Sequence, residues 1–293
     1  MQFLKIHLLM LLCAVLVAGS FPVVASISHE LDPVLLTLLR FLLASFLFAP
    51  LIWFRYGFKV SLAALGRYSV ISATLVICFW SMFFSLRYTT ALNISAIFTL
   101  VPSLSGLYAM VLNRERLGRT RLIALVLGLI GALWIVFKGE LSIFTELSLN
   151  KGDLIFFVGC LFMGLYTPLV RLFHRNEPMP VMAFWVMVTG SLWLLLLAGS
   201  QLTTISFTDI PDKLWMGLLY VAIFSTIISF FITQYAILFL GPTRVMAYSY
   251  LYPALVLFLD FLLKGTIPEL KILPGVVIVL SAMFVVQHRK NNS

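Results

Sequence analysis

The sequence predicts an all-α membrane protein with ten transmembrane helices, arranged as a 5+5 inverted-topology repeat. Three observations lead to this fold class. The chain of 293 residues is 62% hydrophobic and only 11% charged, whereas a soluble domain is about half apolar and about a quarter charged. Ten apolar segments are each long enough to cross a bilayer, and one proline-containing pattern occurs in both halves of the chain. Lipid is therefore the expected solvent of this protein.

The predicted spans follow from length and hydropathy. A helix needs roughly 17 to 25 apolar residues to cross the hydrocarbon core, and the mean hydropathy of the chain is +1.08. Some connections between spans are very short, such as "YTTA" from residue 88 and "LGPT" from residue 240. The ten spans are predicted at residues 6–25, 34–54, 67–87, 91–112, 120–138, 152–173, 179–198, 213–239, 243–263 and 271–288.

The first span has a second interpretation. Lys5, the apolar run "LLMLLCAVLVAG" and the small residues after it could form a signal peptide with a weak cleavage site. The duplication described below favours a helix that stays in place, because removing the first span would leave four helices to match five.

Orientation follows from the Lys and Arg residues in the loops. If the N-terminus is cytoplasmic, thirteen of them lie on the cytoplasmic side and six on the opposite side, while Arg40 lies inside a span. This bias predicts an integral plasma-membrane protein of a bacterial inner membrane, with both termini in the cytoplasm.

A duplication is visible in "AIFTLVPSL" (residues 96–104) and "AYSYLYPAL" (residues 247–255), which share Ala, Leu, Pro and Leu at the same positions. At the same offset of 151 residues, Phe79 pairs with Phe230. Single matches are weak in so apolar a chain, but the matches form an ordered series. The series indicates that the second half of the chain is a copy of the first.

The copies are predicted over residues 1–145 and 146–293, each a five-helix repeat. Because five is odd, the second repeat must enter the membrane from the opposite side. The two halves are then inverted copies, an architecture that many secondary transporters share, with substrate bound near the midplane between the repeats.

Four prolines are candidate kink or gating positions. A proline inside a helix removes a backbone hydrogen bond, and lipid tolerates this only where protein or a water-filled cavity satisfies the freed carbonyl. Pro102 and Pro253 lie near the middle of spans four and nine, and Pro22 and Pro168 lie in the first span of each repeat. Spans four and nine are therefore expected to face the interior, although a harmless kink packed against another helix is the alternative.

Three stretches carry a family resemblance. They are "DPVLLTLLRFLLA" (32–44), "RYTTALNISAIFTLVPSLSGLYAMVLNRERLG" (87–118) before the Gly-bearing "LGLIGA" (127–132), and "FLGPTRVMAYSYLYPALVLFLDFLLKG" (239–265). With them the chain resembles the drug/metabolite transporter superfamily, in its EamA-type branch of ten-helix transporters, over nearly its whole length. The resemblance implies secondary transport or export of amino acids, metabolites or drugs, and leaves the substrate open.

One position departs from the family pattern. The family often repeats an acidic residue after the second proline, but the position equivalent to Glu115 is Thr266. This chain therefore offers no symmetric pair of acids.

Arg40 is the sharpest single candidate for the site. It lies inside span two, where a buried arginine costs about 2.5–3.5 kcal/mol on insertion scales. It should therefore face the protein interior and hold a partner. The guanidinium fork could anchor a substrate carboxylate, or it could cap carbonyls or pair with an acid as a structural residue, the role that the family pattern favours.

Asp260 is the only acid well inside a predicted span, and it lies four residues before Lys264. It could form an i,i+4 pair near the interface. A proton site, or an ion pair with Arg40, is the alternative.

Further candidates for a central cavity are hydroxyl and aromatic residues. The small-residue stripe of span four suits close packing or cavity lining. On span nine, Tyr248 and Tyr252 share a helical face and Tyr250 points the opposite way, so which face lines the cavity stays open. Aromatic faces suit flat or cationic solutes, but they also fill space towards lipid. The predicted substrate-binding residues are Arg40, Trp80, Phe84, Thr99, Ser103, Tyr166, Tyr248 and Tyr252.

The motifs exclude several functions. The three cysteines lie in separate apolar runs, the four histidines form no metal-binding pattern, and there is no phosphate-binding glycine loop. No enzyme signature, cofactor site, catalytic residue or metal site is predicted. The basic residues are scattered in short loops, so nucleic acid is not an expected partner.

We therefore expect a secondary transporter that moves a small organic solute, an amino acid or a related metabolite or drug, by alternating access between two repeats. Its expected partners are that solute and the bilayer; the small-residue stripes could serve internal packing or a homodimer. The alternative is a membrane-embedded lipid-handling protein of the flippase kind, which would need a lateral opening. A structural or receptor subunit that transports nothing is a third interpretation.

Overall fold

The computed structural model describes residues 2–137, 139, 150–199, 202, 211–265 and 269–287. Over these residues it is helical without strands, and ten of its segments are long and apolar enough to cross a membrane. Their bounds lie within a few residues of the predicted spans, so the all-α fold class with ten spans is confirmed.

The elements, in chain order, are α1 (Gln2–Ile27), α2 (Pro33–Tyr56), α3 (Leu62–Ser85), α4 (Ala91–Phe98), α5 (Val101–Leu112), α6 (Arg119–Val136), α8 (Lys151–Phe173), α9 (Met179–Ala198), α10 (Asp212–Ala222), the π-helix η3 (Ile223–Ile228), α11 (Ser229–Leu240), α12 (Pro242–Met246), the 3₁₀-helix η4 (Ala247–Leu251), α13 (Tyr252–Lys264), the 3₁₀-helix η5 (Leu270–Ile272) and α14 (Leu273–Gln287).

Several helices begin where the sequence supplies a capping side chain. Asp32 accepts a hydrogen bond from the first turn of α2, with Pro33 as the first helical residue. Ser61 caps α3 and Asn150 caps α8 in the same way. Such caps satisfy N–H groups that have no partner within the helix, and they place the helix starts close to the predicted span boundaries.

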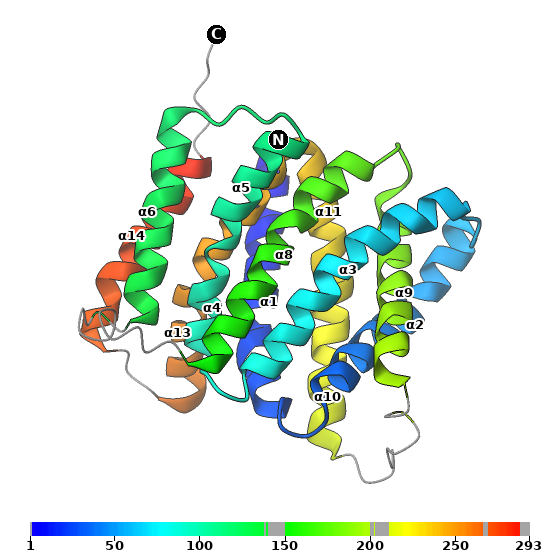
Figure 1. The fold of residues 1–293 in the computed structure, drawn as a ribbon, viewed down its shortest axis with the longest axis horizontal. Helices are drawn as coiled ribbons and strands as arrows, with labels where there is room; N and C mark the ends of the chain where they lie inside the picture. Colours follow the sequence, from blue (N-terminus) through cyan, green and yellow to red (C-terminus); the bar gives the residue numbers. More distant parts are fainter. Residues whose placement is uncertain are drawn as a thin grey trace.

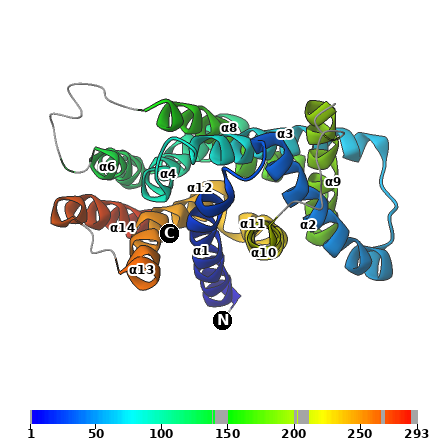
Figure 2. The same ribbon diagram turned by 90° about the horizontal axis from the view of Figure 1, so that it is seen from below.

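The helices form two layers, seen end-on in Figure 2. One layer contains α6, α4, α8 and α3, and the other contains α14, α13, α1, α10 and α11, while α2 and α9 close one side. α1 begins and α14 ends at the same end of the molecule, the top of Figure 1. The core lies between the layers, so residues far apart in the sequence meet there.

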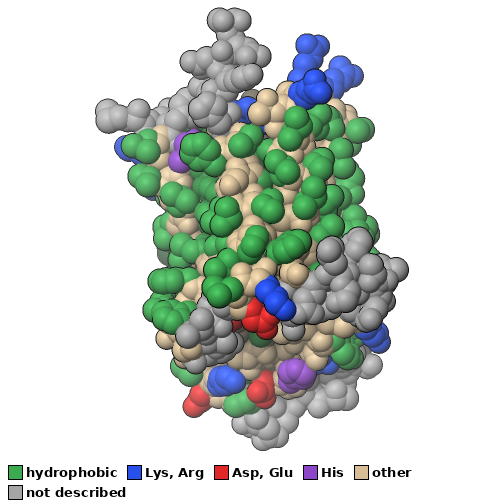
Figure 3. All heavy atoms as spheres, turned by 90° about the vertical axis from the view of Figure 1, so that its left-hand side faces the viewer, with side chains coloured by type: hydrophobic (Ala, Val, Ile, Leu, Met, Phe, Trp, Pro, Cys, Tyr) green, Lys and Arg blue, Asp and Glu red, His purple; other side chains and the backbone are tan. Residues whose placement is uncertain are grey.

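Apolar side chains form a belt across the middle of the face made by α6 and α14 (Figure 3), and the charged side chains lie mostly towards the two ends of that face. Val126 and Ile130 of α6 and Val277 and Phe284 of α14 are among the exposed apolar residues. This distribution matches a bilayer, which covers apolar side chains at mid-height and leaves charges at its two surfaces.

Two spans are interrupted before a proline. Span four consists of two helices, α4 and α5, and α5 begins one residue before Pro102. Span nine consists of α12, η4 and α13, and Pro253 lies in the first turn of α13. The N–H groups of Thr99 and Leu100 bond three residues back rather than four. Proline has no N–H to continue the helical ladder, so each span breaks there. Pro22 and Pro168 lie inside the continuous helices α1 and α8.

Candidate functional site

A cavity lies at the centre of the molecule, between the two layers. Residues from both halves of the chain line it, and its volume is about 40 Å³. Small-molecule sites usually offer about 300–1,000 Å³, so this conformation has room for a few water molecules and would have to widen to hold a small organic molecule. The lining residues are Val17, Ser20, Phe21, Phe79, Met82, Phe98, Met163, Tyr166, Ser225, Ser229, Phe230, Thr233, Met246 and Tyr252.

Aromatic rings form one part of the wall in two groups. In the first group, the ring centroids of Phe21 and Phe98 lie 5.7 Å and 5.4 Å from that of Tyr252. In the second, Phe79 and Phe230 stack with centroids 6.0 Å apart, and Tyr166 lies 6.0 Å from Phe230. Rings at these separations attract one another and present faces and edges to a bound solute.

Hydroxyl groups of α1, η3 and α11 form the polar part of the wall. Ser20 donates to the carbonyl oxygen of Val17 at 2.6 Å, and Ser229 donates to that of Ser225 at 2.7 Å. Each hydroxyl has one hydrogen and two lone pairs. Because the hydrogens bond backbone carbonyls, these oxygens can accept hydrogen bonds from N–H or O–H groups in the cavity.

Arg40 lies behind this wall and is fully buried. Its Nε donates to Thr226 Oγ1 at 2.8 Å, and its Nη2 donates to the carbonyl oxygen of Ser225 at 3.0 Å. The guanidinium carbon lies 3.8 Å from the ring centroid of Phe79. Arg40 Nη1 is buried without a hydrogen-bond partner among the described residues. Phe79 and Ser225 thus lie in the wall and Arg40 is one layer behind them.

The π-helix η3 explains how Arg40 is held. Thr226 Oγ1 donates to the carbonyl oxygen of Val221, five residues earlier, at 2.7 Å. A π-turn is wider than an α-turn, and here the carbonyl of Ser225 accepts from both Arg40 and Ser229. A side chain of span two therefore fastens the irregular middle of span eight. Arg40 donates to one carbonyl oxygen and to two hydroxyls of η3, which is close to the carbonyl-capping role that the sequence left open.

Other predicted residues have different surroundings. Trp80 and Phe84 lie outside the cavity lining, in an aromatic row that continues to Tyr88, with ring centroids 5.6 Å and 5.4 Å apart. Thr99 donates to the carbonyl oxygen of Ala96, and Ser103 donates to that of Leu125 on α6 at 3.0 Å. Both hydroxyls therefore bond to backbone carbonyl oxygens, and neither residue lines the cavity.

The tyrosines of span nine separate as their spacing predicts. Tyr248 and Tyr252 both turn towards α1, where Tyr248 contacts His7 at 2.5 Å, while Tyr250 packs against Gly128 of α6. Only Tyr252 of the three lines the cavity. The face that looks towards α1 is therefore the one that reaches the site.

Each of the four candidate prolines lies within four residues of a cavity-lining aromatic residue: Pro22 follows Phe21, Pro253 follows Tyr252, Pro168 follows Tyr166, and Pro102 follows Phe98. In spans four and nine, where the helix is interrupted, backbone irregularity and aromatic lining therefore coincide.

Asp260 is half-buried on α13 and does not line the cavity. Arg40 donates its hydrogen bonds to Thr226 and Ser225 of η3. The proton-site or ion-pair role of Asp260 stays a prediction.

Sequence reasoning did not nominate several of the lining residues. Phe79 and Phe230 are equivalent at the 151-residue offset, which is a usable signal, because equivalents related by a two-fold axis would meet near that axis. For the hydroxyls of Ser225, Ser229 and Thr233 the sequence offers only a weak signal, the clustering of Ser and Thr in an otherwise apolar span.

Comparison with known proteins gives related chains at low identity. The sequence model described as "EamA-like transporter family" matches residues 4–137 and again residues 150–287. The uncharacterized transporter YyaM of Bacillus subtilis (strain 168) is 22% identical over 97% of this chain and 94% of its own length. An uncharacterized transporter of Archaeoglobus fulgidus is 28% identical over 96% of each chain. A solved structure titled "Crystal structure of protein" shares the fold, with a TM-score of 0.69, 17% identity and 94% of each chain covered.

Proposed function

The chain belongs to the EamA-like transporter family, and on this premise we propose that it is a secondary transporter that carries a small organic solute through the central cavity by alternating access. The observation that carries the proposal is the cavity itself, which lies at mid-height and is lined by both halves of the chain. Alternating access requires such a shared site, since opening one side or the other is a movement of one half against the other.

Inverted repeats are supported by three features. The family's sequence model matches each half separately. α6 packs against α14 and α2 against α9, which are equivalent spans, and the contacts of α3 and α5 with α8 have counterparts in those of α11 and α13 with α1. Phe79 and Phe230, equivalent at the 151-residue offset, stack at the centre with planes 17° apart. A two-fold axis in the membrane plane would bring equivalents together in this way.

The solute that fits best is an amino acid or a related amphipathic metabolite. The aromatic groups would cover its apolar part, and the lone pairs of Ser20, Ser229 and Thr233 would accept hydrogen bonds from an ammonium group. Arg40, one layer behind Phe79, makes the cavity electrically positive, and its Nη1 amino group, which has no hydrogen-bond partner among the described residues, could donate to a carboxylate. A rotation of Phe79 would complete that contact.

The residues that line the cavity give little support for coupling to a proton gradient. No acidic residue or histidine is among the residues that line it in the described part of the chain. Exchange or the gradient of the solute itself is then the simpler driving force. Asp260, which is half-buried on α13, is the acid that we predict as a possible proton site.

Location and assembly complete the proposal. The Lys and Arg bias of the loops supports a bacterial inner membrane with both termini in the cytoplasm. The outer face of α6 and α14 could join two copies in a homodimer or face lipid.

Counterflow in proteoliposomes tests the function. Vesicles loaded with one unlabelled amino acid should accumulate the labelled form saturably, and Tyr252→Ala or Phe230→Ala should reduce this flux about tenfold or more by removing the aromatic wall. Trp80→Ala, outside the cavity, is the matched control. Saturable counterflow of no amino acid, metabolite or drug, together with scrambling of labelled lipid, would instead support the lipid-handling alternative.

A further inference from the structure

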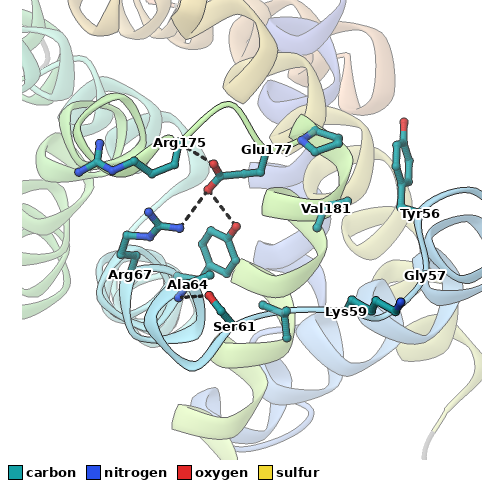
Figure 4. A pocket seen from close by; sticks show the side chains of 12 residues that line it. Tyr56, Gly57, Lys59, Ser61, Ala64, Arg67, Arg175, Glu177 and Val181 are labelled. Carbon is teal, nitrogen blue, oxygen red and sulfur yellow. Dashed lines mark hydrogen bonds and ion pairs between the residues drawn. The ribbon is translucent and has the colours of Figure 1, made fainter.

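A second pocket, drawn in Figure 4, lies at the end of the molecule where α1 begins and α14 ends, the top of Figure 1. It has a volume of about 360 Å³ and lies between the α2–α3 connection and the α8–α9 connection. That volume falls within the range of about 300–1,000 Å³ that ligand sites occupy. The lining residues are Tyr56, Gly57, Lys59, Val60, Ser61, Ala64, Arg67, Tyr68, Arg175, Glu177, Pro178 and Val181.

The pocket carries an excess of positive charge. Three of its lining side chains are cationic, and Glu177 is the one acid among them. The carboxylate of Glu177 already accepts from the Tyr68 hydroxyl at 2.9 Å and the Arg175 N–H at 2.5 Å, and its Oε1 lies 3.6 Å from Arg67 Nη2. Its charge is therefore compensated. Lys59 is a further lining residue, on the α2–α3 connection.

One donor in this pocket lacks an acceptor of its own. Arg67 Nε is buried without a hydrogen-bond partner among the described residues, and a buried donor without an acceptor costs free energy. α3 and α9 both begin at the pocket, and the positive ends of their dipoles favour an anion there. Several of their first N–H groups already have acceptors: Ala64 N–H bonds Ser61 Oγ, and the N–H groups of Val181 and Met182 bond the carbonyl oxygen of Pro178.

The surroundings indicate where the anion comes from. Leu62, next to Ser61, is 87% exposed, and Trp53 near the end of α2 is 59% exposed. Exposed leucine and tryptophan beside basic residues are typical of the membrane interface. An anion that enters here would find its charged part in the pocket and any acyl chains beside Leu62 and Trp53.

We propose that this pocket binds a phosphate group, and that its source is the headgroup of an anionic membrane lipid. Lys59 and Arg67 bind the phosphate oxygens, and the dipoles of α3 and α9, which begin at the pocket, add to its positive potential. Because α2 and α3 belong to the first half and α8 and α9 to the second, the bound headgroup links the two halves and stabilises the conformation described here.

Lipid binding to the purified full-length protein tests the proposal. Native mass spectrometry and thermal stability would be measured in detergent with short-chain phosphatidylglycerol, with phosphatidylcholine and with inorganic phosphate. We expect phosphatidylglycerol to bind more tightly than phosphatidylcholine and to raise the melting temperature. Lys59→Gln should weaken phosphatidylglycerol binding about fivefold, and Arg119→Gln, an exposed arginine at the same end but outside the pocket, should not change it.

The three ligands and the variants distinguish a lipid headgroup from free phosphate as the source of the bound group. Inorganic phosphate that displaces phosphatidylglycerol from the wild type but not from Arg67→Gln supports a phosphate site, and equal affinity for both would make free phosphate the source. Lys59 is exposed, so its variant keeps the test valid even where Arg67→Gln fails to fold. Equal binding of phosphatidylglycerol by Lys59→Gln and Arg119→Gln, or no preference over phosphatidylcholine, would overturn the proposal.

Discussion

At the scale of single residues, Arg40 shows how a costly side chain is accommodated in the membrane interior. The guanidinium is fully buried, and it bonds to the wide turn of η3 while its face rests on Phe79. A π-turn exposes a carbonyl that an α-helix would use itself, so the irregular helix and the buried arginine each satisfy the other. Both would lose partners if one were removed.

Arg40→Lys should therefore destabilise the protein despite keeping the charge. A lysine ammonium cannot span Thr226 and Ser225 as the fork does, and each lost interhelical hydrogen bond costs about 0.6 kcal/mol on average. We expect a loss of about 1–2 kcal/mol in stability and slower counterflow. Thermal unfolding in detergent, with the exposed Arg119→Lys as control, measures this. An unchanged melting temperature and an unchanged flux would contradict the role assigned to Arg40.

Glu177 gives a pH dependence at the same scale. Partial burial acts to raise the pKa of its carboxyl, but the hydrogen bonds from its own N–H, Tyr68 and Arg175 and the charge of Arg67 outweigh burial and lower the pKa below 4.5. A lowered folded-state pKa means that Glu177 contributes stability above the unfolded pKa. That contribution is lost as the pH falls through the lower folded pKa.

Melting temperatures measured from pH 7 downwards should thus fall below about pH 4.5 in the wild type. In Glu177→Gln the part of this fall that comes from Glu177 should be absent, because the amide does not titrate. Identical pH profiles for the two proteins would show that the Glu177 cluster adds nothing to stability.

At the scale of elements, the prolines and glycines decide how the spans pack. Pro102 and Pro253 end one helical segment and begin another, and aromatic residues beside both breaks reach the cavity. Their mid-span position was readable from the sequence. The sequence does not predict the 3₁₀ turn before Pro253 or the π-turn of η3, because local sequence patterns do not specify which backbone carbonyls a neighbouring helix will satisfy.

Gly131 of α6 and Gly275 of α14 mark the closest approach of two helices. A Cβ atom on Gly131 would lie 2.9 Å from the carbonyl oxygen of Gly275, and one on Gly275 would lie 2.9 Å from that of Gly131. The helices therefore touch backbone to backbone, as small residues permit in membranes.

Gly131→Ala should force α6 and α14 apart and lower stability by about 1–3 kcal/mol, the usual cost of overpacking. Gly66→Ala on α3 is the matched control, since a Cβ there would meet nothing within 4 Å. It should be neutral or slightly stabilising, because alanine favours a helix more than glycine does. The melting temperatures of Gly131→Ala and Gly66→Ala test this prediction. Equal values would mean that α6 and α14 can accommodate a Cβ atom at Gly131 without strain.

At the scale of the whole molecule, the apolar belt and the arrangement of charges predict one orientation. Lys59 lies at the end where α1 begins, and Glu30 follows the opposite end of α1. Positive loops stay in the cytoplasm, so these two exposed positions should lie on opposite sides of the membrane.

Labelling with a membrane-impermeant maleimide measures this. The native cysteines Cys13, Cys78 and Cys160 are buried and should not react. In intact cells, Glu30→Cys should be labelled and Lys59→Cys should be labelled only after permeabilisation. Labelling of Lys59→Cys in intact cells would reverse the proposed orientation, and labelling of both would contradict the ten-span topology.

The sequence by itself determined the solvent, the ten spans and the family, because hydropathy over a span length and the proline pattern are local properties that lipid acts on directly. It also placed Arg40, Tyr166 and Tyr252 near the centre. Only the tertiary structure decided that Phe79 and Phe230 meet, that Trp80 and Phe84 lie outside the cavity, and that η3 holds Arg40. In so apolar a chain nearly every helical face is hydrophobic, so composition cannot distinguish a face that meets lipid from one that meets protein, and only packing between helices separates them.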